Sequence, residues 1–394
     1  MPESRKEAKM PHFTNVVKTV PFNILDAADA VRFDYFMLED FTCPVILFDR
    51  LLLKSAGFPP HPHAGLCVFT YLFEDSEGSL RDRDSMPEEI MVEPGGLLWF
   101  QMASGMIHEE NPAVDGKTVH QFQVWVNLAK DKHGLPPATM QIKSKDVPVA
   151  EPESGGKTRV LLGSYRGKTS PLTPTEPFTL LDIALRGGQT ITQPSDEWSA
   201  MLYCLSGTVD VNIGGGKQAR LFPEEVVGIQ GHAAITIGSD AAHLIYMAKP
   251  LLDQPLVVQG MYAMCSQGEI DAAKRRFHAG GLGEVVPYPE VVHPEEKYVP
   301  AGQEPDLAVT PVVLRQATVR HYDEGWWKLH LQYCRYEYNN TETAHGYRFV
   351  WEDPDGGERP LRLGGYIPYM EYARQLLDIA KTEGWGDIPY RDSF

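Results

Sequence analysis

The chain has 394 residues, which is enough for two or three domains that each bury a core of their own. Hydrophobic residues make up 43% of it and charged residues 23%, as is ordinary for a soluble globular protein. It contains 36 Lys and Arg residues and 53 Asp and Glu residues. The resulting formal net charge of −17 argues against non-specific binding to nucleic acid.

The cysteines and the N-terminal residues bear on the cellular compartment. The five cysteines are scattered, and their odd number argues against a full disulfide framework. Residues 1–20 contain no apolar segment followed by a small-residue cleavage site, and no run of about 18 apolar residues occurs anywhere. We therefore expect a cytoplasmic protein with neither a membrane nor a direct nucleic-acid partner.

Residues 21–140 have the sequence pattern of a first β-barrel. After an expected N-terminal arm at residues 1–20, short β-branched and aromatic runs alternate with Gly, Pro and Asp, which is typical of antiparallel strands and turns. Gly105 lies just beyond one such run, and its missing Cβ suits a close approach of the backbone. The strands that we expect lie at residues 45–48, 67–73, 97–102 and 120–127.

Two segments of this first barrel carry candidate metal ligands at alternate positions. His61 and His63 lie in one segment, and His108 and Glu110 lie in the other, so that each pair falls on one face of a strand. A lone His-x-His is more often a structural pair than a metal site, but two such pairs beside glycines favour a shared site. Three imidazoles and one carboxylate suit a divalent first-row metal.

The strand expected at residues 120–127 has two different faces. Gln121, Gln123 and Trp125 share one face, whereas His120 lies on the other and is expected to be structural. The alternation does not decide which face lines the pocket. If the glutamines point inward, Gln123 is a candidate hydrogen-bond donor to a metal ligand; otherwise it is a solvated side chain on the outside of the barrel.

A second barrel is expected at residues 159–283, after a linker at residues 141–158. Asp196-Glu197-Trp198 stands before the expected strand at residues 199–207, so this segment has no His-x-His pair like that of the first barrel. His232 and His243 are far apart and have no paired carboxylate, so we expect a partner barrel without a metal site. Its other expected strands lie at residues 160–163, 178–185 and 234–238, with a hairpin tip at residues 214–216.

The C-terminal part contains a helix, a linker and an extension. Ser266 and Glu269 form the signature of a capping box, and the helix that they begin is expected to end at Gly280. Residues 284–306 are rich in proline and predict an extended linker. Residues 307–394 predict a small α+β extension, whose aromatic residues suit its own core, a lid over the metal barrel or a dimer interface. Its expected elements are strands at residues 326–333 and 347–351, a turn at residues 353–357 and a helix at residues 369–382.

Six segments in the first part of the chain resemble, in order and spacing, the successive motifs of the pirin family, and the likeness extends over residues 20–283. Pirins have two cupin barrels in one chain, with a metal, usually iron, in the N-terminal barrel only. The resemblance implies an all-β fold of two tandem cupin (jelly-roll) barrels, with His61, His63, His108 and Glu110 as metal ligands. The segments are Gly57-Phe58-Pro59-Pro60-His61-Pro62-His63-Ala64-Gly65, Thr70-Tyr71-Leu72, Arg83-Asp84-Ser85, Pro94-Gly95, Gly105-Met106-Ile107-His108 with Glu110, and Trp125-Val126-Asn127-Leu128.

Three positions depart from the pattern of the family. Ala64 stands where the family usually has Arg, Asp82 stands where it usually has His, and Glu109-Glu110-Asn111 replaces a Ser-Glu-Met type of sequence. All four implied ligands are present. We therefore expect these departures to change the rim of the pocket, and with it the substrate, more than the metal ligands.

The resemblance also implies an activity, because family members with this site resemble quercetin 2,3-dioxygenases. An octahedral ion held by four protein ligands keeps two positions open for an enolisable substrate and O2. We predict a metal-dependent dioxygenase acting on a flavonol or similar enolisable phenolic compound, with Fe(II) as the expected metal and Ni, Cu, Mn or Zn as alternatives. Glu110 is also the candidate catalytic base for the hydroxyl proton of the substrate.

Two other functions stay open at this stage. Pirins are also described as metal- or redox-responsive regulators that bind a transcription factor, and an acidic surface suits a basic protein partner. The same scaffold can instead perform another biosynthetic step on a phenolic or enolic compound. The sequence leaves a homodimer open in each case.

Overall fold

The computed structural model describes most of the chain, and the segments that it describes form two compact units. The first unit comprises the residues up to Gly283 apart from 59–61, and the second comprises residues 59–61 and those from Glu284 onward. Residues 59–61 belong to a strand that is hydrogen-bonded into a sheet of the first unit. The described residues are 12–21, 27–38, 41–54, 57–86, 89–114, 116–153, 155–193, 195–213, 216–231, 234–285, 290–292, 297–298, 309–321, 327–338, 343–353, 356–360, 376–377 and 379–380.

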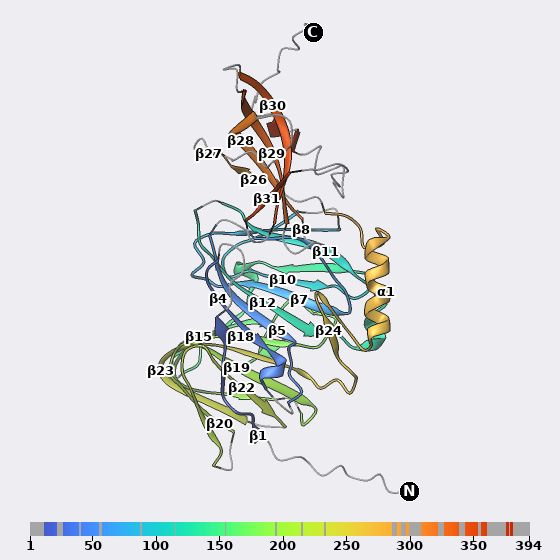
Figure 1. Cartoon of the computed structure of the whole chain (residues 1–394). Helices are drawn as coiled ribbons and strands as arrows, with labels where there is room; N and C mark the ends of the chain where they lie inside the picture. Colours follow the sequence, from blue (N-terminus) through green and yellow to red (C-terminus); the bar gives the residue numbers. More distant parts are fainter. Residues whose placement is uncertain are drawn as a thin grey trace. The chain divides into compact units, whose positions relative to one another are not determined.

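The first cupin barrel is built from two antiparallel sheets (Figure 1). A seven-stranded sheet has the order β13-β10-β7-β12-β5-β4-β3, and a four-stranded sheet has the order β6-β11-β8-β9. The strands of the larger sheet are β3 (Val20–Pro21), β4 (Ala27–Asp34), β5 (Leu47–Leu53), β7 (Leu66–Leu72), β10 (Leu97–Gln101), β12 (Val119–Asn127) and β13 (Ala138–Ile142). Those of the smaller sheet are β6 (Phe58–His63), β8 (Leu80–Asp84), β9 (Glu89–Val92) and β11 (Met106–Pro112). Three short 3-10 helices join them, η1 (Tyr35–Met37), η2 (Lys130–Lys132) and η3 (Ser144–Asp146).

The second cupin barrel is formed by a ten-stranded antiparallel sheet with the central order β22-β19-β23-β18-β15. Two short hairpins and the helix α1 (Gln267–His278) accompany it. The strands of the sheet are β1 (His12–Phe13), β2 (Val17–Lys18), β14 (Val149–Ala150), β15 (Gly156–Leu162), β18 (Thr179–Thr192), β19 (Trp198–Gly207), β20 (Val209–Asn212), β21 (Gln218–Leu221), β22 (Glu225–Gln230) and β23 (Ala234–Pro250). The hairpins are β16 (Ser164–Tyr165) with β17 (Lys168–Thr169), and β24 (Val257–Gln259) with β25 (Tyr262–Met264).

One hydrophobic core joins the two barrels. Phe48 of β5 and Phe122 of β12 pack against Tyr203 of β19, with ring centroids 4.7 Å and 5.9 Å from that of the tyrosine. All three side chains are fully buried, and burying a large aromatic side chain stabilises a fold by roughly 1.5–3 kcal/mol. This packing decides the orientation of β12, because the face with Phe122 lies in the core between the barrels.

Several elements differ from the expectation. β1 and β2 pair with β22 of the second barrel, so this part of the expected N-terminal arm is a strand addition to a sheet. β13 pairs with β10 in the first barrel. Pro and Lys residues in or next to these short strands interrupt the apolar runs that would predict them. Of the hairpin tip expected at residues 214–216, residues 214 and 215 lie outside the described residues.

The C-terminal unit contains a six-stranded antiparallel sheet. β28, β29 and β30 form its centre, and the short strands β26 and β27 pair with β28, although a linker was expected there. The described helical residues of the expected C-terminal helix, Leu376 and Ala380 among them, pack on Leu329 and Leu331 of β29. The appendage is therefore α+β. Its strands are β26 (Glu290–Val292), β27 (Lys297–Tyr298), β28 (Val309–His321), β29 (Trp327–Tyr338), β30 (Thr343–Glu352) and β31 (Glu358–Pro360).

Within the described part of the chain, none of the helices is both long enough and apolar enough to span a membrane.

Candidate metal centre

The strands that carry the candidate ligands lie side by side in the four-stranded sheet. His61 and His63 belong to β6, and His108 and Glu110 belong to β11, its hydrogen-bonded neighbour. Gly57, directly before β6, makes the close approach possible, because a Cβ there would lie 1.8 Å from the carbonyl oxygen of Glu110. Alternation along each strand then places both members of a pair on the same face.

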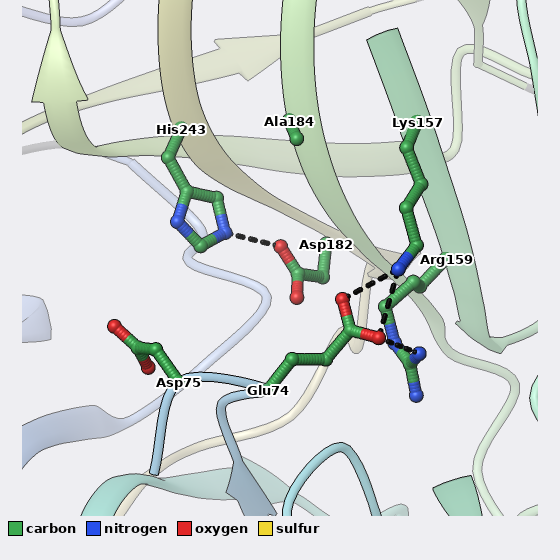
Figure 2. Close-up of a pocket in the computed structure, with 7 residues that line it drawn as sticks. All are labelled: Glu74, Asp75, Lys157, Arg159, Asp182, Ala184 and His243. Atoms are coloured by element: carbon green, nitrogen blue, oxygen red, sulfur yellow. Dashed lines mark hydrogen bonds and ion pairs between the residues drawn. The ribbon is translucent and has the colours of Figure 1, made fainter. Parts of the chain in front are cut away.

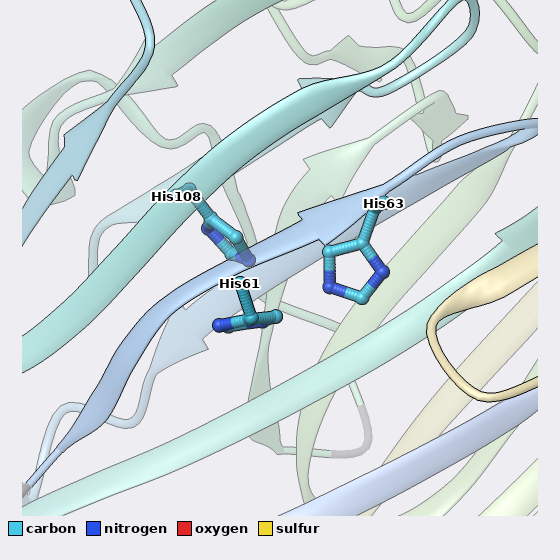
Figure 3. Close-up of side chains that lie close together, drawn as sticks. All are labelled: His61, His63 and His108. Atoms are coloured by element: carbon cyan, nitrogen blue, oxygen red, sulfur yellow. The ribbon is translucent and has the colours of Figure 1, made fainter. Parts of the chain in front are cut away.

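The three histidines form a buried cluster in the first barrel. One ring nitrogen from each of His61, His63 and His108 lies within 4.8 Å of those from the other two. Figure 3 shows the rings of His61 and His63 projecting from one strand towards the ring of His108 on its neighbour. Their side chains are shielded from solvent, with exposed fractions of 2%, 0% and 0%.

Backbone carbonyls orient two of the rings. The Nδ1 atom of His61 donates to the carbonyl of Pro59 over 2.8 Å, and that of His63 donates to the carbonyl of Met261 over 2.9 Å. A carbonyl accepts only, so the neutral ring carries its lone pair on Nε2, the arrangement seen in metal-bound histidines. Burial lowers the pKa of His61 to about 4, which keeps this imidazole neutral at neutral pH.

The ring of His108 is held by a carboxylate and by aromatic neighbours. Its Nδ1 atom lies 3.5 Å from Oδ1 of Asp82. Phe100 packs edge-on against it with a centroid distance of 4.8 Å, and Trp125 packs edge-on against His63 at 4.9 Å. These rings leave the histidines little rotational freedom, and they surround the cluster with apolar groups.

Glu110 is fully buried, and its two oxygens have different surroundings. Its Oε2 atom accepts hydrogen bonds from the side-chain amides of Gln121, over 3.2 Å, and Gln123. Its Oε1 atom has no hydrogen-bond partner among the residues that the structure describes. Burial raises the pKa of Glu110 to about 7, although the hydrogen bonds that it accepts lower it.

The structure brings Glu110 to His108 but does not include it in the three-histidine group. Donor atoms of Asp82, His108 and Glu110 form a second group that also lies within 4.8 Å. The four predicted ligands thus fall into two groups that share His108. The glutamine face of β12 points into the same pocket, since Gln121 and Gln123 both reach Glu110.

Asp82 is a site residue whose position differs from the expectation. We expected it on the rim of the pocket, but it is fully buried on β8, opposite Glu110 in the strand register. Burial, together with the Glu110 and Asp84 carboxylates, raises its pKa well above the usual range. The alternation of Arg81-Asp82-Arg83-Asp84 is the signal that predicts it, because the strand buries both aspartates and leaves the arginines partly exposed.

The residues present are chemically suited to a divalent metal. Three imidazoles converge, and a buried carboxylate oxygen without a hydrogen-bond partner among the described residues lies beside one of them. Leaving a carboxylate oxygen buried and unsatisfied costs free energy that a bound cation would offset. Imidazole with carboxylate is a donor set common to iron, nickel, copper, manganese and zinc sites.

A second polar site lies where the two barrels meet (Figure 2). It is a cavity of about 150 Å³, and its charges are largely paired within the protein. Glu74 binds Lys157 over 2.7 Å and Arg159 over 2.5 Å, while His243 pairs with Asp182. These contacts join the first barrel to the second, and His243, one of the two histidines of the second barrel singled out above, has its partner here. The other, His232, lies outside the described residues.

Comparison with known proteins identifies related chains. Residues 3–126 match the family model described as Pirin, and residues 180–283 match the Pirin C-terminal cupin domain. A Pseudomonas aeruginosa protein named "Putative quercetin 2,3-dioxygenase" is 30% identical over 61% of this chain and 86% of its own length. Human Pirin is 30% identical over 58% of this chain and 79% of its own.

A solved structure supports the same fold. The crystal structure of quercetin 2,3-dioxygenase from Acinetobacter baumannii aligns with a TM-score of 0.62 and 23% identity, over 70% of this chain and 99% of that one. The alignment therefore covers nearly all of that chain and leaves part of the present chain unmatched. With both barrels matched by family models and by relatives, the chain belongs to the pirin family of bicupins.

Proposed function

We propose that this protein is a metal-dependent dioxygenase that acts on a flavonol or a similar enolisable phenolic compound. The observation that carries the proposal is the buried cluster of His61, His63 and His108, with Glu110 beside His108. The name of the Pseudomonas relative supports the choice of substrate class.

In this proposal His61, His63, His108 and Glu110 hold one divalent metal, Fe(II) in the first instance. When bound, such a metal would supply a Lewis acid and a binding site for substrate and O2 oxygens. The hydrogen bonds from His61 and His63 to backbone carbonyls keep their Nε2 atoms basic, and the aromatic rings around them exclude water.

Glu110 is the residue that we propose to take the hydroxyl proton of the substrate. In the metal-free protein burial raises the pKa of Glu110 to about 7, so its carboxylate is a stronger base than that of an exposed glutamate. Gln121 and Gln123 hold Oε2, so Oε1, the oxygen without a hydrogen-bond partner among the described residues, is the one that would face the metal, and it accepts the proton only when it is not bound to the metal. The same two amides then keep the protonated side chain in place.

The test is metal analysis together with oxygen uptake on quercetin. His61→Ala and Glu110→Ala are compared with the parent protein, and His278→Ala, an exposed histidine on α1, is the matched control. We expect both site variants to lose one equivalent of metal and more than about 100-fold of the oxygen uptake, because each removes a direct ligand. The control should match the parent.

Two results would contradict the proposal. If His61→Ala and Glu110→Ala retain the metal, the ligand assignment is wrong. If the parent binds metal at this site but consumes no oxygen with quercetin or related flavonols, the protein is not a dioxygenase of this class, and a metal-responsive regulator becomes the better account.

A further inference from the structure

A second cluster of metal-binding side chains lies outside the site described above. It consists of His133, just beyond η2, with Cys265 and Glu269 at the start of α1. One donor atom from each residue, a ring nitrogen, the thiol sulfur and a carboxylate oxygen, lies within 4.8 Å of the other two. These residues are far apart in the sequence, and the fold brings them together.

His133 shows the hydrogen-bonding pattern of a metal ligand. Its Nε2 atom donates to the carbonyl of Leu128 over 3.1 Å, which leaves the lone pair of the neutral ring on Nδ1. That Nδ1 atom is buried and finds no hydrogen-bond partner within the described segments. A buried acceptor left unsatisfied costs about 1–3 kcal/mol, and a metal ion bound to this nitrogen would remove that cost. Histidines that bind metals commonly donate their other N–H to a backbone carbonyl in this way.

Cys265 and Glu269 are already fixed by the start of the helix. Ser266 is the N-cap of α1, and its hydroxyl accepts from the backbone N–H of Glu269 over 3.3 Å. The Oε2 atom of Glu269 in turn accepts from the backbone N–H of Cys265 over 2.9 Å. Only 6% of Cys265 is exposed, and it forms no disulfide with any described cysteine.

Helix capping alone does not account for this arrangement. It explains the carboxylate of Glu269, and an ion pair of 3.5 Å with the exposed Lys130 adds to that role. It does not explain a buried sulfur beside a buried, unsatisfied imidazole nitrogen. Nitrogen, sulfur and oxygen donors together are typical of tetrahedral zinc, whose donor atoms lie about 3.4–3.8 Å apart. The three donor atoms, within 4.8 Å of one another, lie close to that range.

We propose that His133, Cys265 and Glu269 form a second metal site, suited to Zn²⁺, with a water molecule as the fourth ligand. The site links the loop after η2 to the segment that leads into α1. β25 lies in this segment, and Met261, just before β25, provides the carbonyl that orients His63. A metal ion here would therefore stabilise the wall of the first-barrel pocket.

Co²⁺ titration of the metal-free, full-length protein tests the proposal. A thiolate bound to Co²⁺ gives a near-ultraviolet charge-transfer band, and the four proposed ligands of the first barrel include no sulfur, so the band reports the second site alone. We expect the band in the parent protein and its loss in Cys265→Ser and in His133→Gln. Cys43→Ser, which changes a cysteine outside the cluster, is the control and should keep the band.

The two sites can be separated by stoichiometry. His63→Ala should lose one equivalent of Co²⁺ and retain the band, whereas Cys265→Ser should lose one equivalent together with the band. Circular dichroism of each variant shows whether it is folded, and His133→Gln provides a second, conservative variant. Absence of the band in the parent, or its persistence in folded Cys265→Ser, would contradict the proposal of a second site. Neither result would bear on the proposed dioxygenase function.

Discussion

At the scale of single residues, Gln123 is the closest partner of the proposed ligand Glu110. Its amide donates to Oε2, so it fixes the carboxylate from the neighbouring sheet. We expect Gln123→Ala to lower the metal affinity of the first-barrel site about 10- to 100-fold, because the carboxylate loses its orientation. Competition with a chelator measures this metal affinity. The measurement is made in a Cys265→Ser background, so that only the first-barrel site contributes. Gln141→Ala, which removes an amide bound to the Met91 carbonyl, should leave the affinity unchanged.

Asp82 gives a second prediction for the same site. Its Oδ1 atom lies 3.5 Å from Nδ1 of His108, where a carboxylate strengthens the ring as a metal ligand. Asp82→Asn keeps the size of the side chain but cannot ionise when a metal binds beside it, so we expect the metal affinity to fall about tenfold or more. Asp210→Asn, a change to an exposed carboxylate paired with Arg220, is the matched control. Equal affinities in the two variants would show that Asp82 does not support His108.

How much of the site can be predicted differs from residue to residue. Alternation along a strand suffices to place His61 with His63, and the structure confirms that both meet His108. Alternation cannot say which face of β12 lines the pocket, because that depends on the second barrel packing on Phe122. It also cannot say that Asp82 lies opposite Glu110, because strand register is a property of two segments.

At the scale of elements, the contact between the barrels predicts a pH dependence of stability. Although burial lowers it, the Asp182 carboxylate raises the pKa of His243 above its ordinary value of 6.5, and Asp75 and Glu74 add to the effect. Tyr71 of the first barrel donates to the other oxygen of Asp182 over 2.5 Å. A raised histidine pKa means that the native state binds the proton more tightly than the unfolded state does.

The pair should therefore stabilise the protein fully below pH 6.5 and lose this contribution as the pH rises through the pKa of the native state. Urea unfolding at pH 6 and pH 8.5 measures it. We expect His243→Gln to lose about 1 kcal/mol at the lower pH and less at the higher pH. His278→Gln, an exposed histidine, should follow the parent at both. A constant difference between His243→Gln and the parent would mean that the charge of His243 plays no part.

Elements with their own local signal are predicted well, and those that depend on a distant partner are not. The capping residues of α1 lie within four positions of one another, and the structure confirms the N-cap at Ser266. β1 has only two residues and forms because β22, more than two hundred positions away, offers an edge. Among the described strands, β26 and β27 likewise pair only with β28, which lies further along the chain. Their local sequence is rich in prolines, which predict a linker.

At the scale of the whole molecule, a shared hydrophobic core joins the two barrels. The aromatic contact of Phe48 and Phe122 with Tyr203 joins them, while the three-histidine cluster belongs to the first barrel. The strand-like runs predict antiparallel barrels, and the resemblance to the pirin family implies two tandem cupins. The family models end at residue 283, so the sheet formed by β28, β29 and β30 lies outside the part of the chain that they match.

We propose that one metal ion binds among His61, His63, His108 and Glu110 in the first barrel. Anomalous diffraction from crystals of the metal-loaded protein, collected at the absorption edge of that metal, tests it directly. We predict a peak within coordination distance of the three Nε2 atoms and of Oε1 of Glu110. A peak bound by other residues alone, or no peak at this position in protein whose metal content has been established, would contradict the claim.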